Sequence, residues 1–180
     1  VELAGGGEDD PAEILRQQRD QRNRHLIAQK PGPRQAGLAA RVELEAGKHA
    51  IVGAATASPM AGQKPEFQLP LQRQGLDVSG IFYFGESVLL PAYQGQGIGH
   101  RFFDAREAAA RAAGAVQTSF CAVIRSDDHP MRPATPRDLH PFWRGRGYAP
   151  VPGLTFTLIW QDVGDAVESA HLMQFWMRDL

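Results

Sequence analysis

Seven residues near the middle of the chain, Gln94 to His100, have the composition of a loop that binds phosphate. Gly95, Gly97 and Gly99 have no side chains, so the backbone there can approach a ligand closely. The segment joins an apolar run to an amphipathic stretch. The unpaired N–H groups and partial positive charge of a helix N-terminus favour an anion at such a junction. The spacing therefore predicts a phosphate or pyrophosphate site that needs no Lys or Arg, or else a tight turn without a ligand.

Two common phosphate-binding motifs do not fit this loop. The dinucleotide fingerprint needs a third glycine where the chain has Phe102. The P-loop needs Gly-Lys-Ser/Thr, whereas Gly99 is followed by His100 and Arg101. The kind of phosphate ligand must therefore be inferred from the flanking segments.

Those flanking segments resemble the GNAT superfamily of acetyl-CoA-dependent N-acyltransferases. Gln94-x-x-Gly97-x-Gly99, preceded by VLLP and followed by an amphipathic stretch, is similar to that family's acetyl-CoA signature. Downstream, the segment 142–148, FWRGRGY, is similar to the family's short-helix motif, an aromatic pair followed by glycine and another aromatic. One apolar run separates the two motifs, as the family requires, and the resemblance covers about residues 40–160.

The resemblance implies where acetyl-CoA binds. The pyrophosphate is expected on the loop's backbone N–H groups, and the pantetheine arm is expected to pair with the preceding strand. The residues expected to bind it are Val88, Leu89, Leu90, Gln94, Gly95, Gln96, Gly97, Ile98, Gly99 and His100. A bulge expected near Gly85 to Ser87 would open this strand from its neighbour around Ser119 to Val123. An N–H near Leu89 could then polarise the thioester carbonyl.

Direct attack by an amine, as in that family, needs a group that takes the amine proton. Glu86 is the preferred base, because an apolar run surrounds it and such surroundings favour a carboxyl that takes up protons near neutrality. Its alternative role is to pair with a basic side chain or to cap the bulge. Tyr83 is the second candidate, as an acid or as part of the substrate wall, with a core position as its alternative. Trp143 stands where many family members have the Tyr that protonates the leaving thiolate, so the general acid stays open.

Asp127 and His129 follow the next strand and are weaker candidates for binding a cationic acceptor. Together with Asp128 and His140 they match no common ligand spacing, so we expect no metal site. Cys121 is expected to be a buried apolar side chain rather than a nucleophile.

The element order predicts an α/β fold with a mixed, mostly antiparallel sheet, helices on both faces and one central β-α-β crossover, as in GNAT proteins. The expected helices are 10–29, 97–113 and 139–146, and the expected strands are 40–45, 49–57, 81–90, 115–124 and 154–161. The connection 59–80 is expected to carry a short helix at about 67–73 and to act as a lid or substrate wall. The tail 171–180 is short and amphipathic.

Length and charge limit the other possibilities. We expect a single domain over residues 1–180, with a truncated first strand possible because the chain does not begin with Met. The net charge of −1 argues against a nucleic-acid or anionic-membrane partner, and no apolar run is long enough to span a bilayer. A single cysteine favours a reducing cytoplasm. The expected partner is a small-molecule or peptide amine; a homodimer stays open, as does a CoA-binding module that has lost catalysis.

Overall fold

A computed structural model describes residues 36–45, 48–126, 128–129, 137–162 and 164–180, and side chains from residue 51 onward. The helix predicted over 10–29 lies outside this part of the chain. The strands are β1 (Ala36–Glu45), β2 (Lys48–Pro59), β3 (Ile81–Leu89), β4 (Gln117–Val123), β5 (Ala149–Trp160) and β6 (Ser169–Asp179). The α-helices are α2 (Pro65–Arg73), α3 (Ile98–Ala112) and α4 (His140–Gly145), and single 3-10 turns occupy Met60–Gly62, Val78–Gly80 and Pro91–Tyr93.

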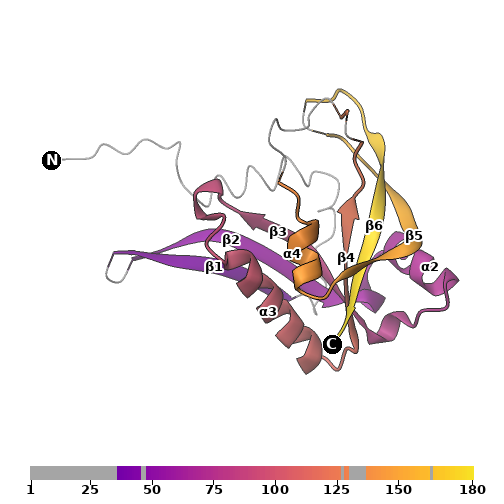
Figure 1. Ribbon diagram of the computed structural model, residues 1–180, viewed down its shortest axis with the longest axis horizontal. Coiled ribbons are helices and arrows are strands. Elements are labelled where there is room, and N and C mark those ends of the chain that lie inside the picture. Colours follow the sequence, from indigo (N-terminus) through magenta and orange to yellow (C-terminus); the bar gives the residue numbers. More distant parts are fainter. Residues whose placement is uncertain (1–35, 46–47, 127, 130–136, 163) are drawn as a thin grey trace.

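The six strands form one sheet in the order β1-β2-β3-β4-β6-β5 (Figure 1). Every neighbouring pair is antiparallel except β3 and β4, which are parallel and joined by α3. The predicted mixed sheet with a single β-α-β crossover is therefore confirmed. The sequence did not predict β6, which lies between β4 and β5 and begins just before the tail we described only as amphipathic.

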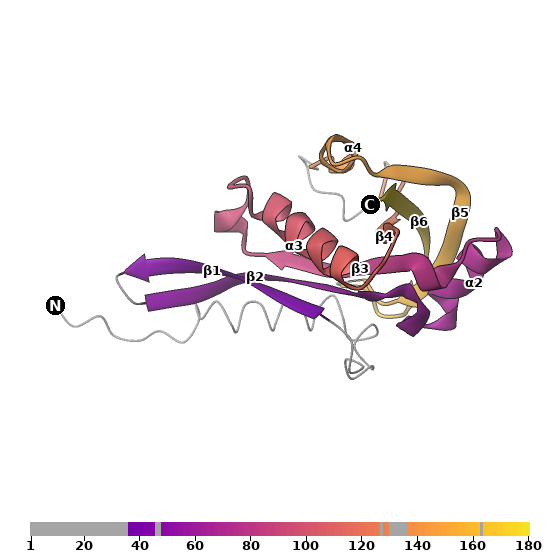
Figure 2. The same ribbon diagram turned by 90° about the horizontal axis from the view of Figure 1, so that it is seen from below.

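Helices cover both faces of the sheet, because side chains along β3 alternate between them. Phe82 and Phe84 pack with α3, while Ile81 and Tyr83 pack with α2. In Figure 2 the twisted sheet curves around α3 and α4, and α2 lies outside the curve beside β5. The α3 side of the core contains the buried residues Ala57, Phe82, Phe84, Phe103, Ala110, Phe120, Tyr148 and Trp176.

Three side chains of the segment 59–80 pack into the core, in contrast to the lid that its composition suggested, while its predicted role as a substrate wall stays a prediction. Met60 and Leu71 are fully buried, and Phe67 packs edge-on against Tyr83 and Phe156. This segment carries the predicted short helix as α2, and it closes the second face of the sheet.

The buried face of α3 is displaced from the predicted one. The spacing of apolar residues predicts a packed face made of Ile98, Phe102, Ala105, Ala109 and Ala112. Ile98 and Phe102 are buried as predicted, but Ala112 is exposed. The buried side chains of this helix are Ile98, Phe102, Phe103, Arg106, Glu107 and Ala110. The prediction was wrong because it counted only apolar residues, and this face includes two charged ones.

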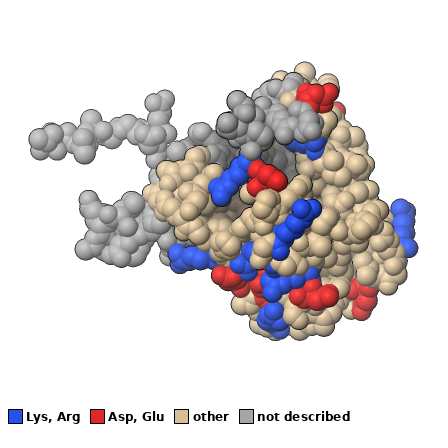
Figure 3. Space-filling model, viewed as in Figure 1, with Lys and Arg blue, Asp and Glu red and all other residues tan. Residues whose placement is uncertain are grey.

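None of the helices in the described residues has the length and apolar character needed to cross a bilayer. On the face drawn in Figure 3, acidic and basic side chains are interspersed, so the described residues show no large area of one sign there.

Candidate active site

Strands β3 and β4 are paired over less than half of their length. Their parallel register covers Ile81 with Gln117, Phe82 with Thr118, and Tyr83 with Ser119. Beyond that point β3 continues beside β2 to Leu89, and β4 continues beside β6 to Val123. Among the described residues the two facing edges share no further pair, and the strands diverge in Figure 1. The opening expected between these strands is confirmed.

A β-bulge lies where β3 leaves β4. Ala55 faces Ser87 and Ala57 faces Phe84, so Gly85 and Glu86 stand opposite Thr56 alone. The Glu86 N–H donates to Thr56 Oγ1 at 3.1 Å. A Cβ on residue 85 would lie 2.6 Å from the same oxygen, so this close approach needs glycine. The predicted bulge is confirmed.

The glycine loop connects the far end of β3 to α3. Gly95 and Gly97 both have φ of +77°, which favours glycine. A Cβ at either position would have no protein atom within 4 Å, so the backbone there faces open space rather than packed side chains. Among the described residues, the backbone N–H groups from Gly95 to His100 donate to no backbone oxygen. The next one along the chain, that of Arg101, donates to the Gly97 carbonyl at 3.3 Å. Such a loop fits a phosphate group.

The two sequence motifs contact each other. His100, in the first turn of α3, packs edge-on against Phe142 of α4 with ring centroids 4.8 Å apart. Arg146, just after α4, has Nη1 at 3.3 Å from the Nδ1 of His100 and pairs through Nη2 with Asp104 at 2.7 Å. The α4 segment is thus held against the start of α3.

Glu86 lies at the bulge with an exposed side chain, not enclosed by the apolar run as expected. The extra residue in the bulge interrupts the alternation of β3, so the carboxylate does not enter the core. Tyr83 lies just before the bulge on the α2 side. Burial, then interaction with Cys121, raises its pKa well above the usual range, and the charge of Glu86 adds to this. Tyr83 therefore holds its proton firmly.

The aromatic residues of the second motif are packed in the core. The Trp143 ring lies 5.0 Å from those of Phe120 and Trp176. The hydroxyl of Tyr148 lies 2.8 Å from Thr118 Oγ1 and donates to Glu107 at 3.2 Å. Burial raises the pKa of Tyr148, so this phenol is held protonated within a structural network.

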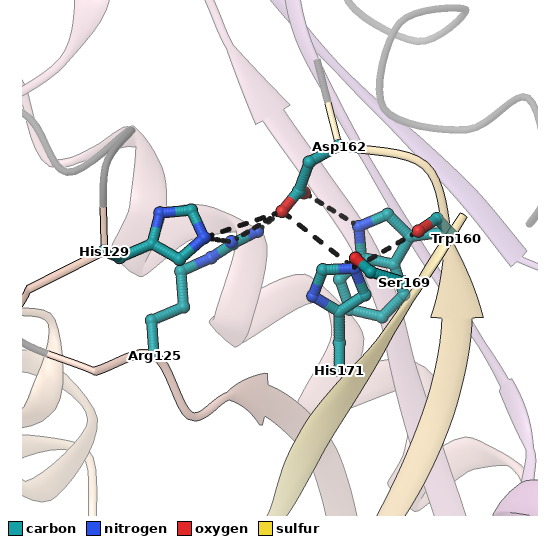
Figure 4. Close-up of polar contacts among 6 residues, drawn as sticks. All are labelled: Arg125, His129, Trp160, Asp162, Ser169 and His171. Atoms are coloured by element: carbon teal, nitrogen blue, oxygen red, sulfur yellow. Dashed lines mark hydrogen bonds and ion pairs between the residues drawn. The ribbon is translucent and has the colours of Figure 1, made fainter. Parts of the chain in front are cut away.

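Of the two weaker candidates, Asp127 lies outside the described residues and His129 lies in a polar cluster beyond the end of β4 (Figure 4). The centre of this cluster is Asp162, which accepts two hydrogen bonds from Arg125, at 2.8 and 2.9 Å. His129 Nε2 lies 2.9 Å from Arg125 Nη1 and 3.7 Å from Asp162. His171 lies 3.9 Å from Asp162 and stacks on Trp160. The cluster joins the end of β4 to the β5–β6 hairpin.

The described residues include no group of three or more His, Cys, Asp and Glu side chains arranged to hold a metal. Burial raises the pKa of Cys121 well above that of a free thiol, which keeps it in the unreactive protonated form. The sequence did not single out Arg106, which is buried beside the opening and donates to Ser87 at 2.9 Å. Residues three apart on a helix lie on the same face, so its spacing from Phe103 is the one sequence signal that could have placed Arg106 toward the sheet.

No family model matches the chain, and no curated protein matches it by sequence. Solved structures do match. A candidate acyl-CoA N-acyltransferase from Klebsiella pneumoniae is 15% identical, with 94% of this chain and 86% of that chain covered and a TM-score of 0.52. An aminoglycoside 6'-N-acetyltransferase complexed with coenzyme A is 11% identical, with 99% and 97% covered and a TM-score of 0.56.

A third structure, a candidate streptothricin acetyltransferase from Bacillus anthracis in complex with acetyl coenzyme A, is 11% identical. It has a TM-score of 0.52, with 83% of this chain and 65% of that chain covered. The chain therefore has the fold of the GNAT N-acetyltransferases.

Proposed function

We propose that this protein transfers an acetyl group from acetyl-CoA directly to the amine of a small molecule or peptide. The observation that carries the proposal is the opening between β3 and β4, which begins at the bulge and leads along β3 to the glycine loop. A chain-like cosubstrate with a phosphate end and a reactive end matches this arrangement. Two of the similar structures contain coenzyme A or acetyl coenzyme A, which supports the choice of ligand.

The loop supplies the phosphate end of the proposed site. Backbone N–H groups from Gly95 to His100 would bind the pyrophosphate, helped by the N-terminal partial charge of α3. The side chain of Gln96 stabilises the loop, because its Nε2 donates a hydrogen bond to the Ala92 carbonyl at 3.0 Å. Val88, Leu89 and Leu90, with Gln94 at the start of the loop, would line the arm. Residues 88 and 89 lie on the part of β3 that has no β4 partner in the described structure.

The bulge supplies the reactive end. In the proposed reaction the amine nitrogen bonds to the acetyl carbon, the carbon–sulfur bond breaks, and its electron pair leaves on the sulfur of CoA. Glu86 takes the proton that the amine loses, directly or through water. Its exposed position makes the carboxylate accessible to an amine arriving from solvent. Tyr83 is retained only as a wall of the acceptor site, since its raised pKa makes it a poor base and a weak proton donor.

A second candidate function is CoA binding without catalysis. Trp143 favours it, because an indole cannot protonate the leaving sulfur. In the first proposal, the choice of an amine as acceptor has one support. One similar structure is named as an aminoglycoside N-acetyltransferase.

Thermal unfolding with acetyl-CoA, followed by assay of free CoA thiol in the presence of a panel of amines, separates these possibilities. We expect acetyl-CoA to raise the melting temperature and at least one amine to release thiol. A rise in melting temperature without release of thiol by any amine favours a protein that binds CoA without catalysis. No rise at all would contradict both proposals.

A further inference from the structure

Among the described residues, Arg106 is a buried cation that forms no ion pair, and the charge of Glu107 offsets only part of the effect of its burial. Only 2% of its surface is exposed, although it belongs to α3. Its Nε donates to the Phe102 carbonyl at 3.2 Å, and its Nη1 donates to Ser87 Oγ at 2.9 Å. The guanidinium lies over two rings, at 4.6 Å from the centroid of Phe84 and 4.7 Å from that of Phe103. Burial lowers the pKa of Arg106 to about 10, so it remains charged at neutral pH.

The nearby arginines have the partner that Arg106 lacks. Arg146 pairs with Asp104 at 2.7 Å and Glu107 at 3.1 Å, and Arg178 pairs with Glu107 at 3.0 Å. The carboxylate next to Arg106 in sequence is thus used by two other cations. A buried charge that forms no ion pair is costly, and an apolar side chain of similar volume would pack there at lower cost. Packing alone therefore does not explain an arginine at this position.

The position of Arg106 relates it to the opening between β3 and β4. Phe84 is the first β3 residue after the last β3–β4 pair, and Ser87 lies in the unpaired half with an exposed side chain. The guanidinium therefore lies at the closed end of the opening, on its α3 side. Glu86 stands between Phe84 and Ser87 in sequence, and its charge acts on Tyr83, on the α2 side.

The length of the opening relates the guanidinium to the reactive end of CoA. From Leu89 back to Phe84, five residues of extended strand cover about 17 Å. The pantetheine arm, with two amide groups and a terminal thiol, has a comparable length when extended. A CoA molecule with its pyrophosphate at the glycine loop would therefore bring its sulfur near the bulge, on the level of Arg106.

We propose that Arg106 stabilises the thiolate of CoA as it leaves, which rests on the proposed function. When the carbon–sulfur bond breaks, the sulfur takes the electron pair and becomes negatively charged. A fixed guanidinium, held by two rings and two hydrogen bonds, lowers the energy of that charge without giving up a proton. The thiolate takes its proton from water after release. With this role for Arg106, the reaction needs no tyrosine to protonate the leaving sulfur, so Trp143 can occupy that position.

Binding of CoA as a function of pH tests the inference without knowledge of the amine. A thiolate-stabilising group lowers the pKa of the bound thiol, so CoA should bind more tightly as pH rises toward and past about 8.5. We expect the Kd of CoA to fall at least about fivefold between about pH 6.5 and pH 9. Each unit by which the protein lowers the pKa of the bound thiol can lower Kd by up to about tenfold. CoA lacking its sulfur has no thiol, and its Kd should change less than about twofold over the same range.

Variants of Arg106 test whether its guanidinium causes the tightening of CoA binding with pH. In Arg106→Met the tightening with pH should disappear while sulfur-free CoA still binds, and in Arg106→Lys, which keeps a charge, part of it should remain. Arg111→Met, an exposed change on the same helix, should retain the full effect. If Arg106→Met does not fold, Arg106→Gln takes its place.

Three outcomes would overturn a claim. Equal pH dependence for CoA and sulfur-free CoA in the unmodified protein overturns the role of Arg106, whatever the variants do. So does tightening that persists after the guanidinium is removed. Failure of acetyl-CoA, CoA and sulfur-free CoA to bind at all instead contradicts the proposed function itself.

Discussion

The two halves of strand β3 differ in what lies beside them. Ile81–Tyr83 pairs with β4, and its three side chains lie in the two cores. The half from Phe84 to Leu89 pairs with β2 but has no β4 partner in the described structure, and it includes the bulge, exposed Glu86 and exposed Ser87. The difference teaches that one strand can anchor the fold in one half and expose reactive groups and backbone in the other. Changes in the first half should therefore affect stability, and changes in the second should affect binding and turnover.

The largest expected effect is in the paired half. Phe82 is 4% exposed and lies in the α3-side core, so Phe82→Ala should lower the free energy of unfolding by about 3–5 kcal/mol. Urea denaturation measures this change. A loss below about 1 kcal/mol would show that the paired half is not the anchor.

The loop at the end of the open half should determine acetyl-CoA binding. In Gly97→Glu a carboxylate would occupy the proposed phosphate cradle, and affinity for acetyl-CoA should fall at least about 100-fold, or about 2.7 kcal/mol. Isothermal titration calorimetry measures it.

Gly114→Glu is a matched control for that change. Gly114 also has φ of +77° and open space around it, but it follows the opposite end of α3. Both variants should lose about 1–2 kcal/mol of stability from the left-handed backbone. Only the change at residue 97 should weaken acetyl-CoA binding, and an equal loss in both would remove the loop from the proposed site.

Glu86→Gln tests the reactive end of the open half. Removing a general base should lower turnover about 100-fold, with unfolding free energy changed by less than about 0.5 kcal/mol. Steady-state assays across pH measure turnover, and urea denaturation measures the unfolding free energy, with exposed Glu66→Gln on α2 as the control. Turnover that is unchanged at every pH would remove Glu86 as the base.

The smallest expected effect concerns the tyrosine of the second motif. Tyr148→Phe removes a hydroxyl bound to Thr118 and Glu107, so the protein should lose about 1–2 kcal/mol of stability. Turnover should stay within about twofold, because this phenol lies in the core network rather than at the opening. A large loss of turnover in a folded variant would make Tyr148 the missing acid.

Local sequence patterns predicted two backbone features of the candidate site, the bulge and the glycine loop. The bulge followed from Gly85 within an apolar run, and the loop followed from glycines at a strand–helix junction. Both are determined by backbone chemistry within a few residues, which a single sequence carries.

Tertiary packing determined what the sequence did not show. β6 is apolar on both faces, with Phe175 and Trp176 both buried, so it lacks the alternation of a half-exposed strand, and nothing local indicates that it lies between β4 and β5. Arg106 was missed because an arginine on a helix is normally exposed. The groups that receive it in the core, the rings of Phe84 and Phe103 and the hydrogen-bond acceptor on Ser87, come from tertiary packing.

Amide hydrogen exchange with and without acetyl-CoA tests the central claim most directly, because it locates the ligand on the two halves of β3. We expect slower exchange in peptides that cover 86–101, where the ligand would bind backbone N–H groups, and no change at the C-terminal end of α3 around Gly114. Protection confined to other segments, or no protection at saturating acetyl-CoA, would contradict the claim that the opening between β3 and β4 is an acetyl-CoA site.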